Sequence, residues 1–441
     1  MRARQAAAVP PDPSGAVPRD APVPVPQGAT GRVRPVRLAP LVLVALVVAA
    51  GVVLRFCATS PLWLDEAQSV AISRLPPPRL FAALRGDGSP PLYYLLLHGW
   101  MGLVGTGDFA VRALSGLFAT AALPLFHLLA RPVGASAGRV TLVLAATNPW
   151  LVRYATEARP YALAVLLVLA GVLALDAVRR RPGPLRAGVL ALITGLLLLT
   201  HYWSLFLYAV VGAGVLGWLL RTRSRRAGWS LAGLAAGALP FLPWLPSFWY
   251  QVRHTGTPWT GRHGPQVLLH LVAEWSTAGV GPAGALLLVT WPLMVWGALA
   301  NGARTRLLGG AAAAALLLGV GVAWLTASAA VSRYTAVVVP LAMLLLGAGT
   351  ALLPRLWAAV LVGALTLAWL ATDAALITRD RTFAGPVSAV LNRHLTDADT
   401  VVFCPDQLGP DIVRRLRHRP RLVSLPRQDW PGRLDWTDYQ R

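Results

Sequence analysis

The chain has 441 residues, of which 56 % are hydrophobic and only 13 % are charged, and its formal net charge is +22. All 40 basic residues are arginine, and many lie in short clusters between apolar runs, which is the positive-inside pattern of membrane proteins. This composition excludes a soluble globular protein and argues against a nucleic-acid partner.

Residues 1–37 are rich in Pro and Ala and lack the apolar region of a cleavable signal, so we predict a disordered cytoplasmic tail. A membrane-spanning helix needs about 20 mainly apolar residues, and 38–377 therefore form a transmembrane domain of about eleven spans in an all-α polytopic protein. The predicted spans are 38–57, 109–130, 139–156, 161–178, 187–202, 204–220, 228–246, 281–300, 307–328, 335–352 and 356–376. Because this number is odd and the N-terminus is cytoplasmic, the chain after residue 377 is predicted to be extracytoplasmic.

The first external loop, residues 58–108, contains two predicted short helices, Asp65–Arg74 and Pro78–Leu84, separated by prolines. The apolar segment Pro90–His98 is too short to span a bilayer. A true span there would turn the later arginine clusters outward, so we interpret it as an interfacial helix.

Two further external segments follow, a tight turn at Tyr154–Tyr161 and a longer loop at 247–280. Aromatic side chains of that loop can stack on a sugar or anchor the chain at the interface. Its polar and aromatic residues are Trp249, Tyr250, Arg253, His254, Trp259, Arg262 and His263. The polar end of the chain, 378–441, is predicted to be a small extracytoplasmic α/β domain with a strand at Thr400–Cys404 and a helix at Pro410–His418.

The adjacent carboxylates Asp65 and Glu66 are candidates for chemistry at the outer face. One of them can act as general base, or both can hold a divalent cation together with a third carboxylate such as Glu157. The alternative is a solvated acidic pair that suits the N-terminal dipole of a helix.

Arg159 and Arg333 are arginines predicted on that face, against the positive-inside trend. A guanidinium is suited to bidentate phosphate capture. The alternatives are an ion pair of Arg159 with Glu157 and snorkelling of Arg333 to the interface. His201 ends a predicted span, where a hydrogen-bonded interface residue is the simpler interpretation.

Taken together, these segments resemble the GT-C glycosyltransferases, in particular the group of protein-O-mannosyltransferases and aminoarabinose-transferase-like proteins. The matching motifs occur in one order: Trp63-Leu64-Asp65-Glu66-Ala67, Pro90-Pro91-Leu92-Tyr93-Tyr94, Asp108-Phe109-Ala110-Val111-Arg112, Asn148-Pro149, Glu157-Ala158-Arg159-Pro160-Tyr161, Thr200-His201-Tyr202 and Ser332-Arg333-Tyr334. The residue before Pro90-Pro91 is often basic or histidine in such proteins, whereas here it is Ser89.

The resemblance implies a polyprenyl-phosphate-linked sugar as donor and an extracytoplasmic glycan, lipid or protein as acceptor. It implies that Asp65 and Glu66 form the catalytic pair with Asp65 as the base, and that Glu66 and Glu157 shape the site or, with Asp65, a divalent-metal site. Arg159 and Arg333 would bind the donor phosphate. Its substrate-binding residues would be Tyr93, Tyr154, Tyr161, His201 and Tyr202.

The sequence thus predicts a multi-pass membrane enzyme that transfers a mannose-like hexose or a pentose by inverting displacement. Two alternatives remain open. One is a transporter or flippase of lipid-linked sugars, which would distribute polar residues through the membrane depth. The other is a non-catalytic assembly partner of the same fold.

Overall fold

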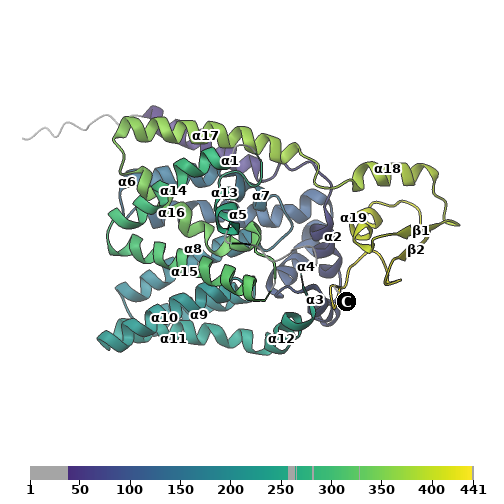
Figure 1. Cartoon of the computed structure of the whole chain (residues 1–441), viewed down its shortest axis with the longest axis horizontal. Helices are drawn as coiled ribbons and strands as arrows, with labels where there is room; N and C mark the ends of the chain where they lie inside the picture. The colour runs from purple at the N-terminus through teal and green to yellow at the C-terminus, as the bar shows by residue number, and fades with distance from the viewer. Residues whose placement is uncertain (1–37, 257–263, 265, 281–282, 327, 440–441) are drawn as a thin grey trace, which may run out of the picture.

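The structure, a computed structural model, describes residues 38–256, 264, 266–280, 283–326 and 328–439. Its helices form a bundle that runs lengthwise, with a small appendage at one end (Figure 1). The predicted tail 1–37 lies outside the described residues, as do Trp259, Arg262 and His263 of the loop 247–280.

Within the described residues, six helical stretches are long and apolar enough to cross a membrane, and all six coincide with predicted spans. They are α5 (Asp108–Ala130), α8 (Tyr161–Arg180), α10 (Ser204–Thr222), the run Arg225–His254, α15 (Ala303–Leu325) and α17 (Arg355–Thr378). The other five predicted spans are shorter apolar helices: α1 (Leu38–Leu54), α6 (Ala135–Thr147), α9 (Pro184–Leu198), α14 (Ala283–Ala300) and α16 (Val339–Thr350). The predicted fold of a polytopic helical membrane protein is confirmed.

The predicted span 139–156 is wrong as one helix. It is divided at Asn148 into α6 and the short α7 (Pro149–Ala155). Pro149 has no amide hydrogen, so it cannot donate a hydrogen bond that would continue α6. It lies in the first turn of α7, where backbone amides have no partner within the helix and proline is tolerated. The Asn148 side chain caps that helix by accepting from the Leu151 amide at 3.1 Å.

Prolines also shape the run Arg225–His254, which continues past the predicted end at 246. It consists of α11 (Arg225–Ala238), the 3₁₀ segment η1 (Leu239–Trp244) and α12 (Leu245–His254). Pro240, Pro243 and Pro246 recur every three residues. Each removes an α-helical hydrogen bond, and their spacing matches the three residues per turn of a 3₁₀ helix.

The helix α16 is the centre of the bundle. All twelve of its residues are buried, which explains why it is apolar on every side. The predicted span 335–352 begins too early, because the 3₁₀ segment η2 (Ser332–Val337) precedes α16 and carries Arg333 outside it. The bundle core therefore ends at η2, next to the polar loops.

Those loops contain the two predicted short helices, observed as α2 (Leu64–Ser73) and α3 (Pro77–Asp87). The predicted interfacial helix is α4 (Leu92–Val104), a shorter apolar helix. The loop before α14 contains α13 (Val267–Glu274). Figure 1 shows α2, α3 and α4 at the end of the bundle that bears the appendage.

The appendage has the predicted α/β character. Its elements are α18 (Ala384–His394), β1 (Thr400–Phe403), η3 (Asp406–Leu408), α19 (Gly409–Val413) and β2 (Arg421–Ser424). The two strands pair in parallel, Thr400 opposite Arg421 and Phe403 opposite Ser424. The predicted helix Pro410–His418 is shorter than expected, whereas the predicted strand at 400–404 is confirmed. After β2 the described chain returns to α3, where the Trp436 amide donates to the Gly86 carbonyl (Figure 1).

We predict that the contact between α14 and α16 tolerates no side chain. A Cβ atom on Gly349 would lie 1.9 Å from the Leu293 carbonyl oxygen, and one on Gly297 would lie 2.0 Å from that of Leu345. Gly349→Ala should therefore lower the free energy of unfolding by about 1–3 kcal/mol through overpacking. The measurement is thermal unfolding of the purified protein in detergent. The matched control is Gly363→Ala, whose new Cβ meets nothing within 4 Å; equal midpoints for the two variants would contradict the packing.

Candidate functional site

The candidate site begins at the N-terminus of α2. Asp65 and Glu66 both lie in the first turn of this helix, where its dipole favours negative charge. The two side chains nevertheless enter different surroundings. Successive residues of a helix point about 100° apart, so neighbours in sequence face different elements.

Glu66 is fully buried, away from solvent. Its carboxylate accepts from Arg112 Nε at 2.7 Å and Nη2 at 2.5 Å, and from the backbone amide of Ala158 at 3.0 Å. Arg112 also donates to the carbonyl oxygens of Ser60 and Pro61. Glu66 thereby holds together the loop before α2, the helix α5 and the turn at Ala158.

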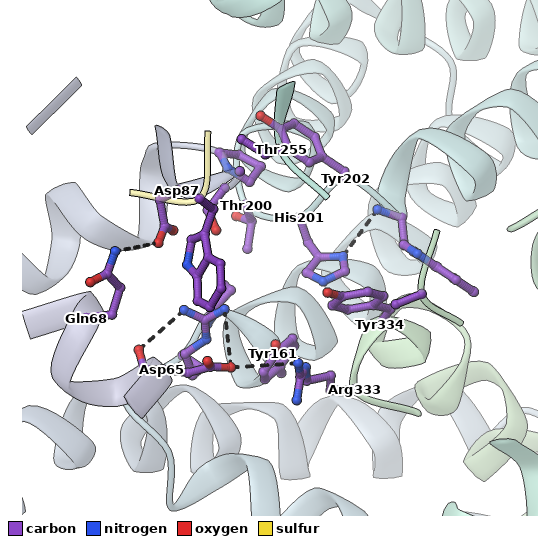
Figure 2. Close-up of a pocket in the computed structure, with 18 of the residues that line it drawn as sticks. Asp65, Gln68, Asp87, Tyr161, Thr200, His201, Tyr202, Thr255, Arg333 and Tyr334 are labelled. Carbon is purple, nitrogen blue, oxygen red and sulfur yellow. Dashed lines mark hydrogen bonds and ion pairs between the residues drawn. The ribbon is translucent and has the colours of Figure 1, made fainter. Parts of the chain in front are cut away.

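Asp65, in contrast, remains partly exposed and faces two arginines. Its Oδ2 lies 4.0 Å from Arg159 Nη2 and 3.9 Å from Arg333 Nη2. Arg159 comes from the turn before α8 and Arg333 from η2, so three distant segments meet here. Figure 2 shows Asp65 and Arg333 of this group. Both guanidinium groups face the same carboxylate, so Asp65 alone does not neutralise the two arginines.

These three side chains line a cavity of about 270 Å³. Its wall also contains residues of the loop after α3, of the α9–α10 junction and of the chain after α12. Figure 2 shows Gln68 and Asp87 on one side of it, and His201 and Tyr334 on another. The wall of the cavity is therefore built from segments that are far apart in the sequence.

Asp87 is a second carboxylate of the cavity wall, which the sequence analysis missed. It accepts from Gln68 Nε2 at 3.0 Å and from the Tyr94 hydroxyl at 2.9 Å. Tyr94 in turn lies 3.2 Å from Arg159 Nη1, which links the two sides of the site. The sequence signal that could have identified Asp87 is its position directly before the turn Gly88-Ser89-Pro90.

The C-terminal segment 434–438, here called the strap, covers this part of the cavity. Gln68 donates to the Leu434 carbonyl at 2.8 Å and accepts from its amide at 2.9 Å. The Trp436 amide donates to the Gly86 carbonyl at 2.9 Å, and Thr437 pairs with Thr255 in an antiparallel bridge. Trp436 itself lines the cavity. The strap joins the end of the chain to the site.

His201 lies between α9 and α10, outside both helices, and lines the cavity together with Tyr161 and Tyr334. Its ring centroid is 5.7 Å from that of Tyr161 and 5.8 Å from that of Tyr334. Burial, with Arg159 and Arg333 nearby, lowers the pKa of His201 to about 3. The imidazole is neutral near pH 7, and its Nδ1 accepts from the Trp203 amide at 3.2 Å. It is an unsuitable proton donor to a leaving group.

Two of the predicted substrate-binding residues, Tyr154 and Tyr93, lie outside the cavity. Tyr154 packs against Tyr161 behind the cavity wall, with ring centroids 5.0 Å apart. Tyr93 is fully buried, and its hydroxyl bonds to Ser115 at 2.9 Å. Its neighbour Tyr94, one helical step away, makes the contacts with Asp87 and Arg159. Tyr161, His201 and Tyr202 do line the cavity.

The metal predicted between Asp65 and Glu157 does not fit the donor groups. Glu157 is fully buried and is paired with Arg153 at 2.7 Å and Arg381 at 3.8 Å. In the part of the chain that the structure describes, no three His, Cys, Asp or Glu side chains are grouped to hold a metal ion. Glu157 instead forms ion pairs with these two arginines, outside the cavity lining.

Comparison with known proteins decides the fold. No protein-family model matches the chain, and no curated protein matches it. Among solved structures, ArnT from Cupriavidus metallidurans in the apo state matches with a TM-score of 0.63 and 16% identity over 88% of this chain and 86% of ArnT. The fold is of the GT-C type.

Two further structures agree with this fold. ArnT bound to undecaprenyl phosphate has a TM-score of 0.62 at 15% identity, covering 90% of this chain and 87% of that one. The apo oligosaccharyltransferase of Archaeoglobus fulgidus has a TM-score of 0.56 at 10% identity, covering 88% of this chain and 65% of that one. The GT-C-type architecture predicted from the sequence is confirmed.

We predict that Glu66 supports the structure of the site and touches no substrate. Removing one partner of a buried ion pair costs about 3–5 kcal/mol, because the other charge is left without compensation. Glu66→Ala should therefore strongly lower the thermal unfolding midpoint, and Asp65→Ala, at the exposed end of the same turn, should change it little. A Glu66→Ala protein as stable as the wild type would contradict the assignment.

Proposed function

We propose that the chain is a membrane glycosyltransferase. It moves a sugar, a mannose-like hexose or a pentose, from a polyprenyl-phosphate carrier to an acceptor on the extracytoplasmic face by inverting displacement. The observation that supports this most is the placement of Asp65 between Arg159 and Arg333 at a cavity with a second carboxylate, Asp87. The site combines an anion-binding pair with acidic groups suited to hydroxyls.

The two arginines are proposed to bind the carrier phosphate. Arg159 is fixed by Ser69 Oγ at 3.1 Å and Tyr94 at 3.2 Å, and Arg333 lies 5.8 Å from the Trp63 ring centre. Guanidinium groups held in this way need little reorganisation when charge develops on a departing phosphate. ArnT, whose fold this chain shares, has been solved with undecaprenyl phosphate bound, which supports a carrier of that class.

Asp65 is proposed to act as the general base. As the acceptor hydroxyl attacks the anomeric carbon, the bond from oxygen to carbon forms while the bond from carbon to the phosphate oxygen breaks. The hydroxyl proton passes to the Asp65 carboxylate, and the electron pair leaves with the phosphate. The arginines stabilise that charge. Attack opposite the leaving group inverts the anomeric centre.

Asp87 and Trp436 are proposed to hold the sugar, and Gln68 is proposed to position them: its amide donates to Asp87 and to the Leu434 carbonyl and accepts from the Leu434 amide. A carboxylate offers acceptors to sugar hydroxyls, and an indole offers a flat apolar face for the ring. All three line the cavity, and the strap brings Trp436 there. Sugar recognition would then depend on the last residues of the chain.

The base assignment is tested with the full-length protein in proteoliposomes, labelled polyprenyl-phosphate sugars and cell-envelope acceptors. Asp65→Asn should lower kcat by roughly 10²–10⁴-fold, the usual contribution of a general base. Asp380→Asn, which changes an exposed acid outside the cavity, is the matched control and should keep full activity. Equal transfer by Asp65→Asn and wild type would exclude Asp65 as the base, and movement of intact carrier without transfer would indicate a flippase.

The role of the strap is tested separately by Trp436→Ala. Loss of one aromatic stacking contact should lower kcat/KM for the donor by roughly twofold to tenfold. Trp357→Ala, at an exposed tryptophan of α17, is the control. Unchanged kcat/KM for every sugar tried, with normal stability, would remove Trp436 from the sugar site.

A further inference from the structure

A second pocket, distinct from the transfer cavity, lies between the bundle and the appendage. Its volume is about 460 Å³, and its lining comes from the end of α2, the turn before α5, α18 and the chain after α19. Arg74, the C-cap of α2, lies on this pocket, whereas Asp65 at the other end of α2 lies on the transfer cavity. At 1.5 Å per residue, the two Cα atoms are roughly 14 Å apart.

The lining of this pocket is strongly cationic. It contains Arg74, Arg414, Arg415 and Arg417 but one acid, Asp108, an excess of three positive charges. Asp108 is already engaged by Arg414 at 3.0 Å and Arg415 at 3.4 Å. Partial burial and the neighbouring Arg414 lower the pKa of Arg74, a sign of crowded positive charge. An anion in the pocket would relieve this repulsion.

The backbone of the arginine segment is held in place by the side chain of Asn392. Asn392 of α18 donates to the Arg415 carbonyl at 3.0 Å and accepts from the Arg417 amide at 2.8 Å. Arg414 also bonds to the Thr106 carbonyl oxygen, before α5. The backbone that carries these arginines is therefore held by α18, and Arg414 links it to the bundle.

The residues beside this pocket in the chain are apolar and exposed. Leu103 is 83% exposed, Phe109 is 66% exposed and Phe383 is 82% exposed. Phe109 directly follows the lining residue Asp108, and Phe383 comes two residues before the lining residue Gly385. Large exposed apolar side chains beside a membrane bundle are suited to contact lipid chains, and a basic pocket next to them is suited to phosphate headgroups. A free inorganic anion would gain nothing from these neighbouring apolar side chains.

We propose that this pocket binds the phosphate of an anionic lipid headgroup, with the acyl chains against Leu103, Phe109 and Phe383. The site is independent of the transfer reaction, since it shares no lining residue with the transfer cavity. A lipid held there would bridge the appendage to the bundle through Arg415, Arg417 and Arg74.

The test measures lipid retention by the full-length protein in nanodiscs of phosphatidylcholine mixed with phosphatidylglycerol. Lipids that stay bound after extraction into detergent are counted by native mass spectrometry. Arg415→Gln/Arg417→Gln should lower the preference for phosphatidylglycerol roughly tenfold or more. The matched control is Arg419→Gln/Arg421→Gln, which removes the same charge from exposed positions of the appendage outside the pocket.

Three results would overturn the proposal. Equal loss of preference in both double variants would indicate bulk charge, and no loss in either would leave the pocket without a ligand. Inorganic phosphate is the second probe: if it displaces phosphatidylglycerol at concentrations where sulfate does not, the ligand is a soluble phosphate instead of a lipid. Arg417→Glu, a single change at an exposed side chain, keeps the test valid if the double variant is unstable. Asp65→Asn in the same assay should retain lipid normally, which separates this site from the proposed transfer activity.

Discussion

The arrangement of the site depends on the buried pair of Glu66 and Arg112. An isolated carboxylate in an apolar interior would be costly, but this one accepts from Arg112 twice and from the Ala158 amide. The same bonds connect α2, α5 and the turn before α8. Asp65 directly precedes Glu66 in the chain, and Arg159 directly follows Ala158, whose amide donates to Glu66. Their separation is therefore set by an interaction that never reaches the cavity.

A second group of buried ion pairs fixes the turn before α8. Glu157 is paired with Arg153 and Arg381, and Arg381 also donates to the Thr156 carbonyl at 2.8 Å and to its hydroxyl at 2.6 Å. Arg381 follows α17, so the start of the appendage is tied to the same turn. The strap then returns from the appendage to Gln68 and Gly86. The appendage is thus attached at both of its ends to the elements that carry Asp65 and Arg159.

The sequence predicted well what depends on local composition. Apolar runs of about 20 residues can satisfy their backbone in lipid only as helices, so the bundle followed from hydropathy alone. Two predicted spans were wrong for local reasons. Pro149 divides one of them into two helices, and prolines at three-residue spacing extend another through a 3₁₀ segment. The lengths of α6 and α16 were overestimated, because helices buried inside the bundle need not match the thickness of a bilayer.

By itself, the sequence determined a helical membrane protein and placed Asp65, Arg159 and Arg333 at loops that one topology brings to the same end. It did so because arginine clusters and span lengths constrain which loops share a face. Only the tertiary structure decided that Glu66 is buried and Asp65 partly exposed, that Tyr94 and not Tyr93 reaches Arg159, and that Asp87 and Trp436 border the cavity. The direction of one side chain within a helical turn, and the return of a distant segment, depend on packing between elements, which no local pattern records.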